Sequence, residues 1–359
     1  MSIEPVLTVF LENICHNYRL FKETFPNTII AGVVKDQAYG LGAGKVAKAL
    51  YTKENCRTFF VAYPQEGQEI RPFVPDADIY VLQGFDIDNA DIYIQNCLIP
   101  VVNTVETLRA AESFDLPLAV QLETGLNRLG ISFKEAESLD EPTRQKVKTI
   151  LSHLASADEQ KSPQNKEQLE NFKKFIPLFP NAKKTLAASD GAALGSDFSF
   201  DIIRAGAFLY GIKTFPQLAD RQKKVVELTG ALLQVKPLHK GDKVGYNATF
   251  TASADMKIGI VSVGYGDGLL RALSNKGRVF IKEGNTTFEV PLIGRVSMDN
   301  IMCDLTQIPD CILENTKRVY LLTENYNVDE MGKDAGTIGY EVLSLIGNSR
   351  RWKKEYIEN

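Results

Sequence analysis

The feature that most constrains this chain is a regular alternation, from residue 28 to residue 205, between short apolar β-branched runs and segments of helical periodicity. The connecting segments carry apolar residues at positions i, i+3 and i+4, as in Lys45–Thr52 and Lys166–Phe179, which indicates crossover helices. This pattern predicts a closed (β/α)8 barrel of parallel strands, with an open doubly wound sheet as the alternative. The eight predicted strands are Thr28–Lys35, Thr58–Tyr63, Asp78–Gln83, Leu98–Val102, Leu116–Leu122, Lys148–Leu154, Lys184–Ser189 and Asp201–Ala205.

The pattern changes after residue 225, where strand-like runs are separated by Gly-Asp and Gly-Asn turns. We therefore expect two domains, a barrel over residues 1–224 and a mainly β domain over residues 225–359. A helix over Glu12–Phe25 is expected before the first barrel strand, because Pro26-Asn27 breaks helices. The strands predicted in the β domain are Val225–Leu233, Lys257–Val263, Arg278–Ile281, Thr287–Leu292 and Val319–Leu322.

Composition argues against several classes of protein. The formal net charge is −4, which argues against an obligate nucleic-acid binder. No apolar run reaches about 18 residues and the N-terminus lacks the pattern of a signal peptide, so a cytoplasmic protein without a membrane span is expected. The five cysteines form no CxxC pair and the three histidines lie far apart, which predicts neither a disulfide framework nor a metal site. The chemistry must rest on other side chains or on a bound cofactor.

Lys35 stands at the end of the first predicted barrel strand, in VVKDQAYGLGAGK, where a (β/α)8 barrel places its functional groups. The apolar run before it would desolvate its amine, which lowers a lysine pKa and favours a nucleophile or Schiff-base former. A lysine that extends from the strand end into solvent is the alternative. The glycines that follow match neither nucleotide-binding motif, because Lys45 replaces the third glycine of GxGxxG, and Tyr39 and Val46 occupy defining P-loop positions.

Two arginines follow or interrupt later barrel strands. Arg128, in the loop LETGLNRLG after the fifth strand, could bind a carboxylate with both nitrogens, or form a surface ion pair with Glu123. Arg204 interrupts the apolar eighth strand, and a buried arginine is rare without a partner. Gly206 would let a phosphate approach backbone N–H groups, as barrels often bind phosphate beyond strands seven and eight.

Three further residues carry chemistry only in context. Tyr265 lies between two glycines in VSVGYGDGLL, and acting as a base would require nearby cations to lower its pKa from about 10. Considered alone, Tyr265 is compatible with a packing role, Met298 with a core filler, and His153 with a hydrogen-bonded core residue.

The candidate residues occur together in the order seen in alanine racemases, which this chain resembles over nearly its whole length. The matching segments are Lys35 in VVKDQAYGLG, Arg128 in TGLNRLG, Arg204 in FDIIRAGAFLYG, Tyr265 in VGYGDG and Met298 in GRVSMDN. Other pyridoxal-phosphate barrels share the lysine motif, whereas all five segments in register are specific. The resemblance implies a barrel that binds pyridoxal 5′-phosphate and a β domain that supplies part of the partner protomer's active site. It therefore implies a homodimer with shared active sites, alanine as the substrate, and a role in supplying D-alanine for peptidoglycan.

The resemblance also implies roles for these residues. Lys35 would bind the cofactor and act as the base on the D-alanine face, while Tyr265 of the partner subunit would serve the L-alanine face, as racemisation requires. Arg204 would contact the pyridine nitrogen and, because arginine keeps its proton, leave that nitrogen unprotonated. Arg128 and the Met298 N–H would contact the substrate carboxylate, and Arg128 also the phenolic oxygen of the cofactor. His153 would support Arg204 near the ring. The residues implied to hold the phosphate are Tyr39, Ser189, Gly206, Ala207 and Tyr340.

Three positions depart from the family pattern. Gln121 stands where many members carry a carbamylated lysine, and we expect it to hydrogen-bond Arg128, with a bound anion such as chloride as a further possibility. The family's Asn-Ser after strand seven becomes Ala188-Ser189, followed by Asp190, whose charge would repel a phosphate if it faced inward. Gly40-Leu41 replaces a glycine-histidine pair, and nothing in the sequence explains the effect.

Other functions remain as alternatives. A broader racemase acting on serine, lysine or arginine would differ in the size of its side-chain pocket. An amino-acid decarboxylase on the same barrel is disfavoured, because GRVSMDN lacks the cysteine-aspartate signature that such enzymes carry in the β domain. A non-catalytic pyridoxal-phosphate carrier is typically a barrel alone, and the segment after residue 225 argues against it.

Overall fold

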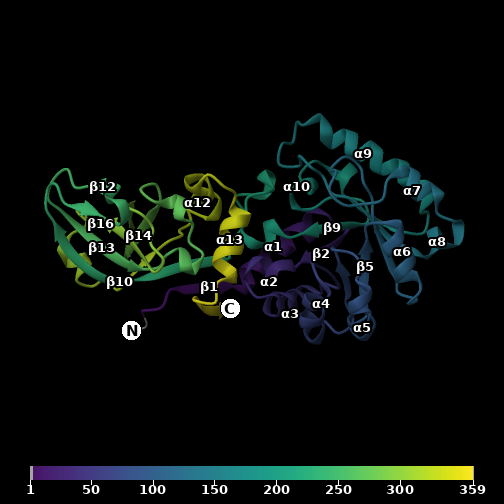
Figure 1. Ribbon diagram of the computed structural model, residues 1–359, viewed down its shortest axis with the longest axis horizontal. Coiled ribbons are helices and arrows are strands. Elements are labelled where there is room, and N and C mark those ends of the chain that lie inside the picture. Colours follow the sequence, from purple (N-terminus) through teal and green to yellow (C-terminus); the bar gives the residue numbers. More distant parts are fainter. Residues whose placement is uncertain (1–2, 359) are drawn as a thin grey trace. The chain divides into compact units, whose positions relative to one another are not determined.

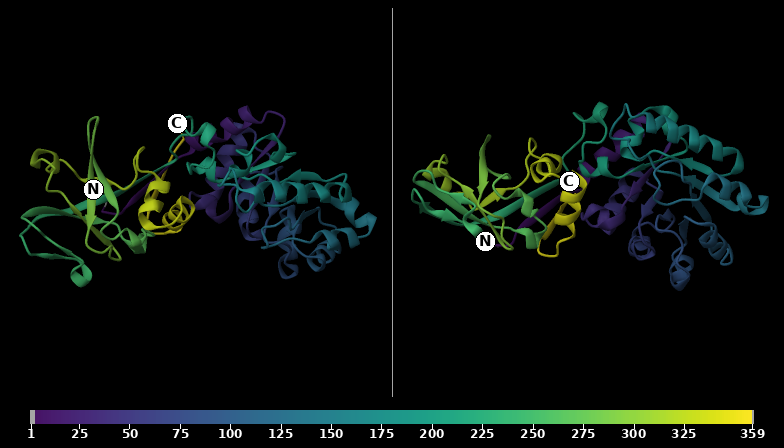
Figure 2. Two further views of the ribbon diagram at one scale, coloured as in Figure 1. Left: turned by 90° about the horizontal axis from the view of Figure 1, so that it is seen from above. Right: turned by 45° about the horizontal axis from the view of Figure 1, so that its top comes forward.

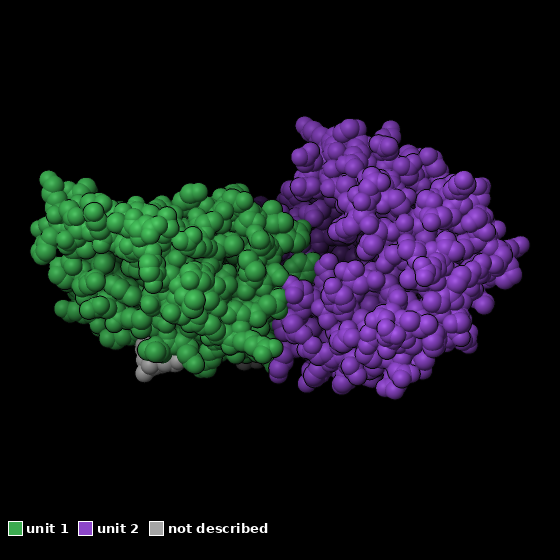
Figure 3. All heavy atoms as spheres, in the orientation of Figure 1, with its two compact units in different colours: residues 1–13, 39–41, 224–359 green, residues 14–38, 42–223 purple. Residues whose placement is uncertain are grey.

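The computed structural model describes residues 3–358, and the chain divides into two compact units. We call the unit of residues 14–38 and 42–223 the barrel unit, and the unit of residues 1–13, 39–41 and 224–359 the β unit (Figure 3). Within residues 3–358, no helix has the length and apolar character needed to cross a membrane.

Eight parallel strands form the centre of the barrel unit, in the order β8-β7-β6-β5-β4-β3-β2-β9. Strand β9 pairs with β2, and Ala188, just beyond β8, forms a parallel bridge with Arg204 of β9. Because this bridge joins the two ends of the strand order, the predicted closed barrel is confirmed over the open sheet. The strands are β2 (Ile29–Val33), β3 (Thr58–Val61), β4 (Asp78–Val81), β5 (Leu98–Val102), β6 (Leu118–Gln121), β7 (Val147–Leu151), β8 (Lys183–Thr185) and β9 (Ile202–Ala205).

Helices surround these strands on the outside of the barrel (Figures 1 and 2). Strands covered in this way are buried on both faces, which is why they appear in the sequence as continuous apolar runs. Strand β3 is an example, since all four of its residues are buried. The helices are α1 (Leu11–Thr24), α3 (Ala43–Glu54), α4 (Pro64–Ile70), α5 (Ala90–Gln95), α6 (Val105–Glu112), α7 (Phe133–Ser138), α8 (Glu141–Lys146), α9 (Pro163–Phe175) and α10 (Ser189–Ala192).

The β unit is built on a second sheet of eight strands, in the order β13-β16-β15-β14-β17-β10-β1-β18. Strand β10 also pairs with β13, with an irregularity between Leu232 and Gln234, so this long strand contacts three neighbours in succession. The elements are β1 (Val6–Phe10), β10 (Val226–Leu238), β11 (Lys243–Val244), β12 (Phe250–Thr251), β13 (Met256–Ser262), β14 (Arg278–Glu283), β15 (Thr286–Ile293), β16 (Asn300–Asp304), α11 (Asp310–Leu313), β17 (Arg318–Tyr320), α12 (Val328–Ala335), α13 (Gly339–Asn348) and β18 (Lys353–Ile357).

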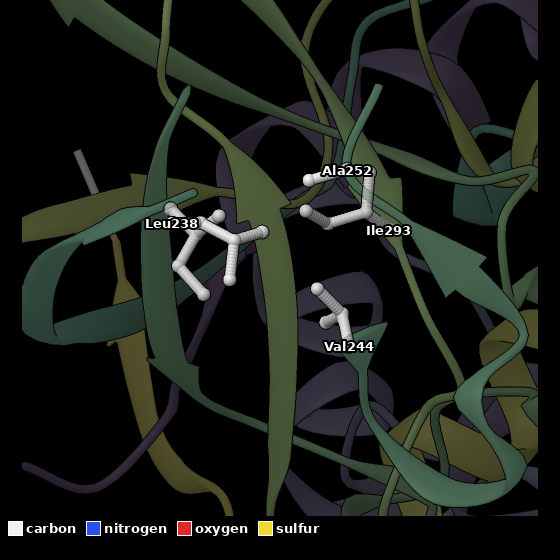
Figure 4. Close-up of a cluster of buried hydrophobic side chains, with 5 residues drawn as sticks. Leu238, Val244, Ala252 and Ile293 are labelled. Carbon is white, nitrogen blue, oxygen red and sulfur yellow. The ribbon is translucent and has the colours of Figure 1, made fainter. Parts of the chain in front are cut away.

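A small apolar cluster holds the β11–β12 hairpin against this sheet. Its buried members come from the hairpin and from three sheet strands, and they are Leu238, Val244, Ala252, Ile258 and Ile293 (Figure 4). Buried apolar contacts of this kind stabilise a short hairpin that its own few hydrogen bonds could not hold.

The first strand, β1, lies in the β unit, although it is not among the predicted strands and residues 1–224 are predicted to form the barrel domain. Strand β1 runs between β10 and β18, antiparallel to the former and parallel to the latter. Both partners lie more than two hundred residues further along the chain. The residues of this strand, VLTVF, have the composition typical of a strand, but nothing in them indicates that their partners lie in the distant β domain.

Candidate active site

Lys35 lies two residues beyond the end of β2, at the carboxyl ends of the parallel barrel strands, where (β/α)8 enzymes place their catalytic groups. Its amine forms no hydrogen bond or ion pair with any group in residues 3–358. Burial, and then the positive charge of Arg128, lower the pKa of Lys35, although Glu66 and Asp36 oppose this effect. A lowered pKa increases the fraction of neutral amine, the form that acts as a nucleophile or base.

The chain leaves Lys35 in a left-handed turn. The φ angles of Asp36, Gln37, Ala38 and Tyr39 lie between 52° and 58°, and such a conformation costs about 1–2 kcal/mol for each residue other than glycine. Glu66 supports the turn, because its Oε1 accepts the Asp36 N–H at 2.7 Å. The sequence does not predict this turn, because none of its four left-handed residues is a glycine.

Glu66 is a residue that sequence reasoning missed. Its Oε2 accepts the N–H groups of Ala62 and Tyr63, at 2.6 and 3.2 Å, so one carboxylate both caps α4 and holds the turn after Lys35. The available signal was a glutamate three residues after the N-cap Tyr63, with proline at the first helical position.

Arg204 is a buried guanidinium surrounded by neutral acceptors. It donates to Thr185 O and Oγ1 at 3.0 and 2.7 Å, and to Ser152 O and Leu186 O at 2.6 and 3.1 Å. Within the described residues it has no carboxylate partner, and its Nε–H has no acceptor. Burial lowers its pKa to about 10, so Arg204 stays protonated at neutral pH and keeps one donor available to a ligand.

His153 lies beside this guanidinium, with Nδ1 3.4 Å from an Arg204 nitrogen. Burial lowers the pKa of His153 to about 3, and the positive charges of Arg204, Arg128 and Lys35 act in the same direction. The imidazole is therefore neutral at ordinary pH, and its unprotonated nitrogen can accept a hydrogen bond from the arginine.

A cluster of hydrogen-bond donors lies beyond β8 and β9. The Ser189 Oγ, which is 2% exposed, accepts the N–H groups of Gly206 and Phe208 at 3.1 and 3.3 Å. Between these two residues, the N–H of Ala207 has no acceptor within residues 3–358. The Ser189 hydroxyl hydrogen and the Ala207 N–H can therefore both donate to an anion, as barrels do for phosphate at this edge.

Arg128 lies in the exposed loop that follows β6, and Gln121 is the partly buried last residue of that strand. Neither side chain hydrogen-bonds to another described residue, so the predicted bond between Gln121 and Arg128 is wrong for this structure. The exposed guanidinium of Arg128 is hydrated by solvent and gains little from one neutral amide. Its charge still lowers the pKa values of Lys35 and His153, so it acts on the same barrel mouth.

The β unit carries the remaining predicted residues. Tyr265 begins the 3₁₀ helix Tyr265–Asp267 and is 42% exposed, and Met298 is 52% exposed. Two backbone hydrogen bonds join their loops, since the N–H of Tyr265 donates to Ser297 O at 3.0 Å and that of Gly266 to Met298 O at 2.9 Å. The Met298 N–H has no acceptor among the described residues and can donate to a ligand.

Residues 39–41 cluster with the β unit, although they follow Lys35 closely in the chain. The Tyr39 and Tyr340 rings lie 6.2 Å apart, and Lys354 Nζ donates to Gly40 O at 2.9 Å. A Cβ added at Gly347 in α13 would lie 2.6 Å from the Gly40 Cα, so only two glycines allow this approach. Sequence inspection missed this contact, since Gly347 lies in an ordinary amphipathic helix.

Comparison with known proteins assigns the family. Residues 9–214 match the model of the alanine racemase N-terminal domain, and residues 225–356 match that of the C-terminal domain. Alanine racemases of Brucella ovis and Rickettsia canadensis are each 37% identical to this chain; the matches cover 98% of this chain and 93% and 98% of those proteins. The alanine racemase structure from Bartonella henselae, described as having covalently bound pyridoxal phosphate, superposes with a TM-score of 0.90 at 32% identity, over 99% of this chain and all of that one.

Together, the fold and the lysine at the barrel mouth define a two-domain (β/α)8 enzyme with a C-terminal β domain. The biosynthetic alanine racemase structure from Pseudomonas aeruginosa has the same architecture, with a TM-score of 0.89 at 30% identity over 99% of this chain and all of that one. The chain belongs to the alanine racemase family.

Proposed function

We propose that this chain interconverts L-alanine and D-alanine with two bases, Lys35 and Tyr265, on opposite faces of the substrate's α-carbon. Membership of the alanine racemase family identifies the reaction as the interconversion of the two alanine enantiomers. The observation that carries the assignment of Lys35 is an amine at the barrel mouth with a lowered pKa and no partner among the described residues. Two bases on opposite faces achieve racemisation because one returns a proton opposite to the face from which the other removed it.

The donors at the barrel mouth fit pyridoxal 5′-phosphate. Lys35 would hold it covalently, the free Nε–H of Arg204 matches an unprotonated ring nitrogen, and Ser189, Gly206 and Ala207 would bind its phosphate. By the family resemblance, Tyr39 and Tyr340 of the β unit would also bind the phosphate. When bound, this cofactor withdraws the electron pair left by loss of the α-proton. Because Arg204 keeps its proton at neutral pH, it would leave the ring nitrogen unprotonated, which would limit side reactions such as transamination.

Substrate binding falls to two further groups. Arg128 is exposed at the barrel mouth and can grip a carboxylate with two parallel N–H donors. The free Met298 N–H would support the same carboxylate. Arg128 also keeps the neighbouring Lys35 amine poised for proton transfer, since its positive charge lowers the lysine pKa.

The enzyme is proposed to act as a homodimer in which Tyr265 and Met298 of the partner subunit complete each site. The exposure of both side chains in the single chain supports this arrangement, because a catalytic phenol must be covered to exclude water. The reaction would supply D-alanine for peptidoglycan.

Two variants test the assignment. Lys35→Ala should abolish the absorbance of the covalently bound cofactor. Tyr265→Phe should slow racemisation by about 10²–10⁴-fold, the usual value of a general acid or base. It should do so equally in both directions, since the two enantiomers have the same free energy.

A solvent-exchange measurement separates the two faces. In D₂O, Tyr265→Phe should still exchange the α-proton of D-alanine with retention, because Lys35 remains on that face, but should not exchange that of L-alanine. Normal racemisation in Tyr265→Phe, or equal exchange from both enantiomers, would contradict the two-base assignment.

A further inference from the structure

Beneath the Tyr265 turn lies a buried carboxylate that the reaction as proposed does not use. Asp267 is 1% exposed, and its Oδ2 accepts the Gly264 N–H at 2.8 Å. Its other oxygen, Oδ1, has no hydrogen-bond partner. Arg351 Nε lies 3.2 Å from this Oδ1, as an ion pair whose angle falls outside hydrogen-bond geometry. Burial raises the pKa of Asp267, while Arg351 and the Gly264 N–H lower it.

Arg351 also reaches the Met298 loop. Its second terminal nitrogen donates to Asp299 Oδ1 at 2.7 Å, so one guanidinium bridges the loop that carries Tyr265 and the loop that carries Met298. Arg351 is half-exposed, but Asp267 is buried, so loss of Arg351 would leave the Asp267 carboxylate without its compensating charge. The bridge therefore makes the geometry of both loops depend on one side chain.

The segment around Arg351 adds further bonds to the same turn. The Trp352 indole N–H donates to Asp267 O at 2.6 Å, and the Ser349 hydroxyl donates to Gly266 O at 3.4 Å. A Cβ added at Gly266 would lie 2.1 Å from an Arg351 nitrogen, so the guanidinium packs directly on the turn.

We infer that Arg351 and Asp267 are positioning residues, which hold Tyr265 and Met298 in one rigid arrangement for catalysis. This inference rests on the proposed role of Tyr265 as the second base. Neither residue is placed on the substrate. Both act through the backbone that carries the phenol, and a displacement of about 1 Å in a catalytic group can cost roughly 100-fold in rate.

The test compares Arg351→Met with Arg350→Met in the holoenzyme. Arg350 is the adjacent exposed arginine and has no ion pair within residues 3–358, so its variant controls for loss of a surface charge. Arg351→Met should slow racemisation by roughly 10- to 100-fold. Exchange of the D-alanine α-proton in D₂O, measured at saturating D-alanine so that weaker substrate binding through Met298 does not contribute, should change less than about twofold, because the turn after Lys35 is held by Glu66 within the barrel unit. Arg351→Lys, which keeps a charge beside Asp267 but cannot bridge both carboxylates, should recover part of the loss.

Other results would overturn the inference. If racemisation and D-alanine exchange both fall at saturating substrate, Arg351 has a general structural role. If neither rate falls, the bridge does not position Tyr265. Should Arg351→Met not fold, Asp299→Asn removes only the exposed arm of the bridge and must show the same selective loss at smaller size. The racemisation rate of Tyr265→Phe is measured in the same experiment. If Tyr265→Phe racemises alanine normally, the two-base proposal is wrong. If Tyr265→Phe loses most of its racemisation rate and Arg351→Met loses none, only the positioning role of Arg351 is refuted.

Discussion

Replacing His153 by glutamine should make the protein less sensitive to acid. The folded state holds the pKa of His153 at about 3, against an ordinary value of 6.5. Between pH 6.5 and pH 3, His153 is therefore protonated in the unfolded chain but neutral in the folded chain. The free energy of unfolding is unaffected by this group above pH 6.5 and decreases as pH falls from 6.5 toward 3. At 1.36 kcal/mol per pH unit, this amounts to about 2 kcal/mol at pH 5 and at most about 5 kcal/mol near pH 3. The imidazole's partial exposure makes these values upper limits.

The measurement is the urea-unfolding free energy of both proteins at pH 8 and pH 5, followed by circular dichroism. The difference at pH 8 gives the cost of losing the side chain itself, and the expected result is that the parent then loses about 2 kcal/mol more than His153→Gln on going to pH 5. With ¹³C-labelled histidine, the resonance missing from the variant should keep its neutral chemical shift down to pH 4. The reasoning would be refuted if the parent and the variant lost the same unfolding free energy between pH 8 and pH 5, or if the imidazole titrated near pH 6.5.

Two further substitutions test how the segment after Lys35 is held. Glu66→Gln replaces one acceptor oxygen by a donor that faces a backbone N–H, so the free energy of unfolding should fall by about 1–3 kcal/mol, and an unchanged urea midpoint would argue against this role. Gly347→Ala should lower stability by about 1–3 kcal/mol although alanine is the better helix former, because its Cβ would meet the Gly40 backbone at 2.6 Å. It should also lower kcat while the cofactor stays bound; a more stable and fully active variant would show that the glycine contact is unimportant.

The barrel could be predicted from the sequence because its signals are local. Most of the parallel strands are buried on both faces and form apolar runs, with β8 (Lys183–Thr185) as an exception, and the helices between them show their own periodicity. Strand β18 lacks such a signal, whereas the run VLTVF of β1 indicates a strand but not the sheet to which it belongs. Lys353–Ile357 is largely polar, as befits a strand at the edge of its sheet, and Val6–Phe10 is defined by partners far along the chain.

The candidate site likewise contains residues that the sequence indicates and features that depend on tertiary contacts. Lys35 and Arg204 stand out because each places a charge at the end of, or inside, an apolar strand. The left-handed turn at Asp36–Tyr39 could not be predicted, because tertiary hydrogen bonds such as that from Glu66 stabilise it against local preference. Asp267 and Arg351 lie 84 positions apart and meet only after the β unit folds.

The central place of β1 in its sheet sets an order on biosynthesis. Ribosomes deliver domains from the N-terminus onward, and residues 14–223 emerge long before β18, so the barrel can fold during translation. Strand β1 precedes all the barrel strands in the chain, yet its two neighbours are β10 and β18, the latter ending at Ile357. The segment that forms β1 therefore remains unpaired along one edge until β18 has been synthesised.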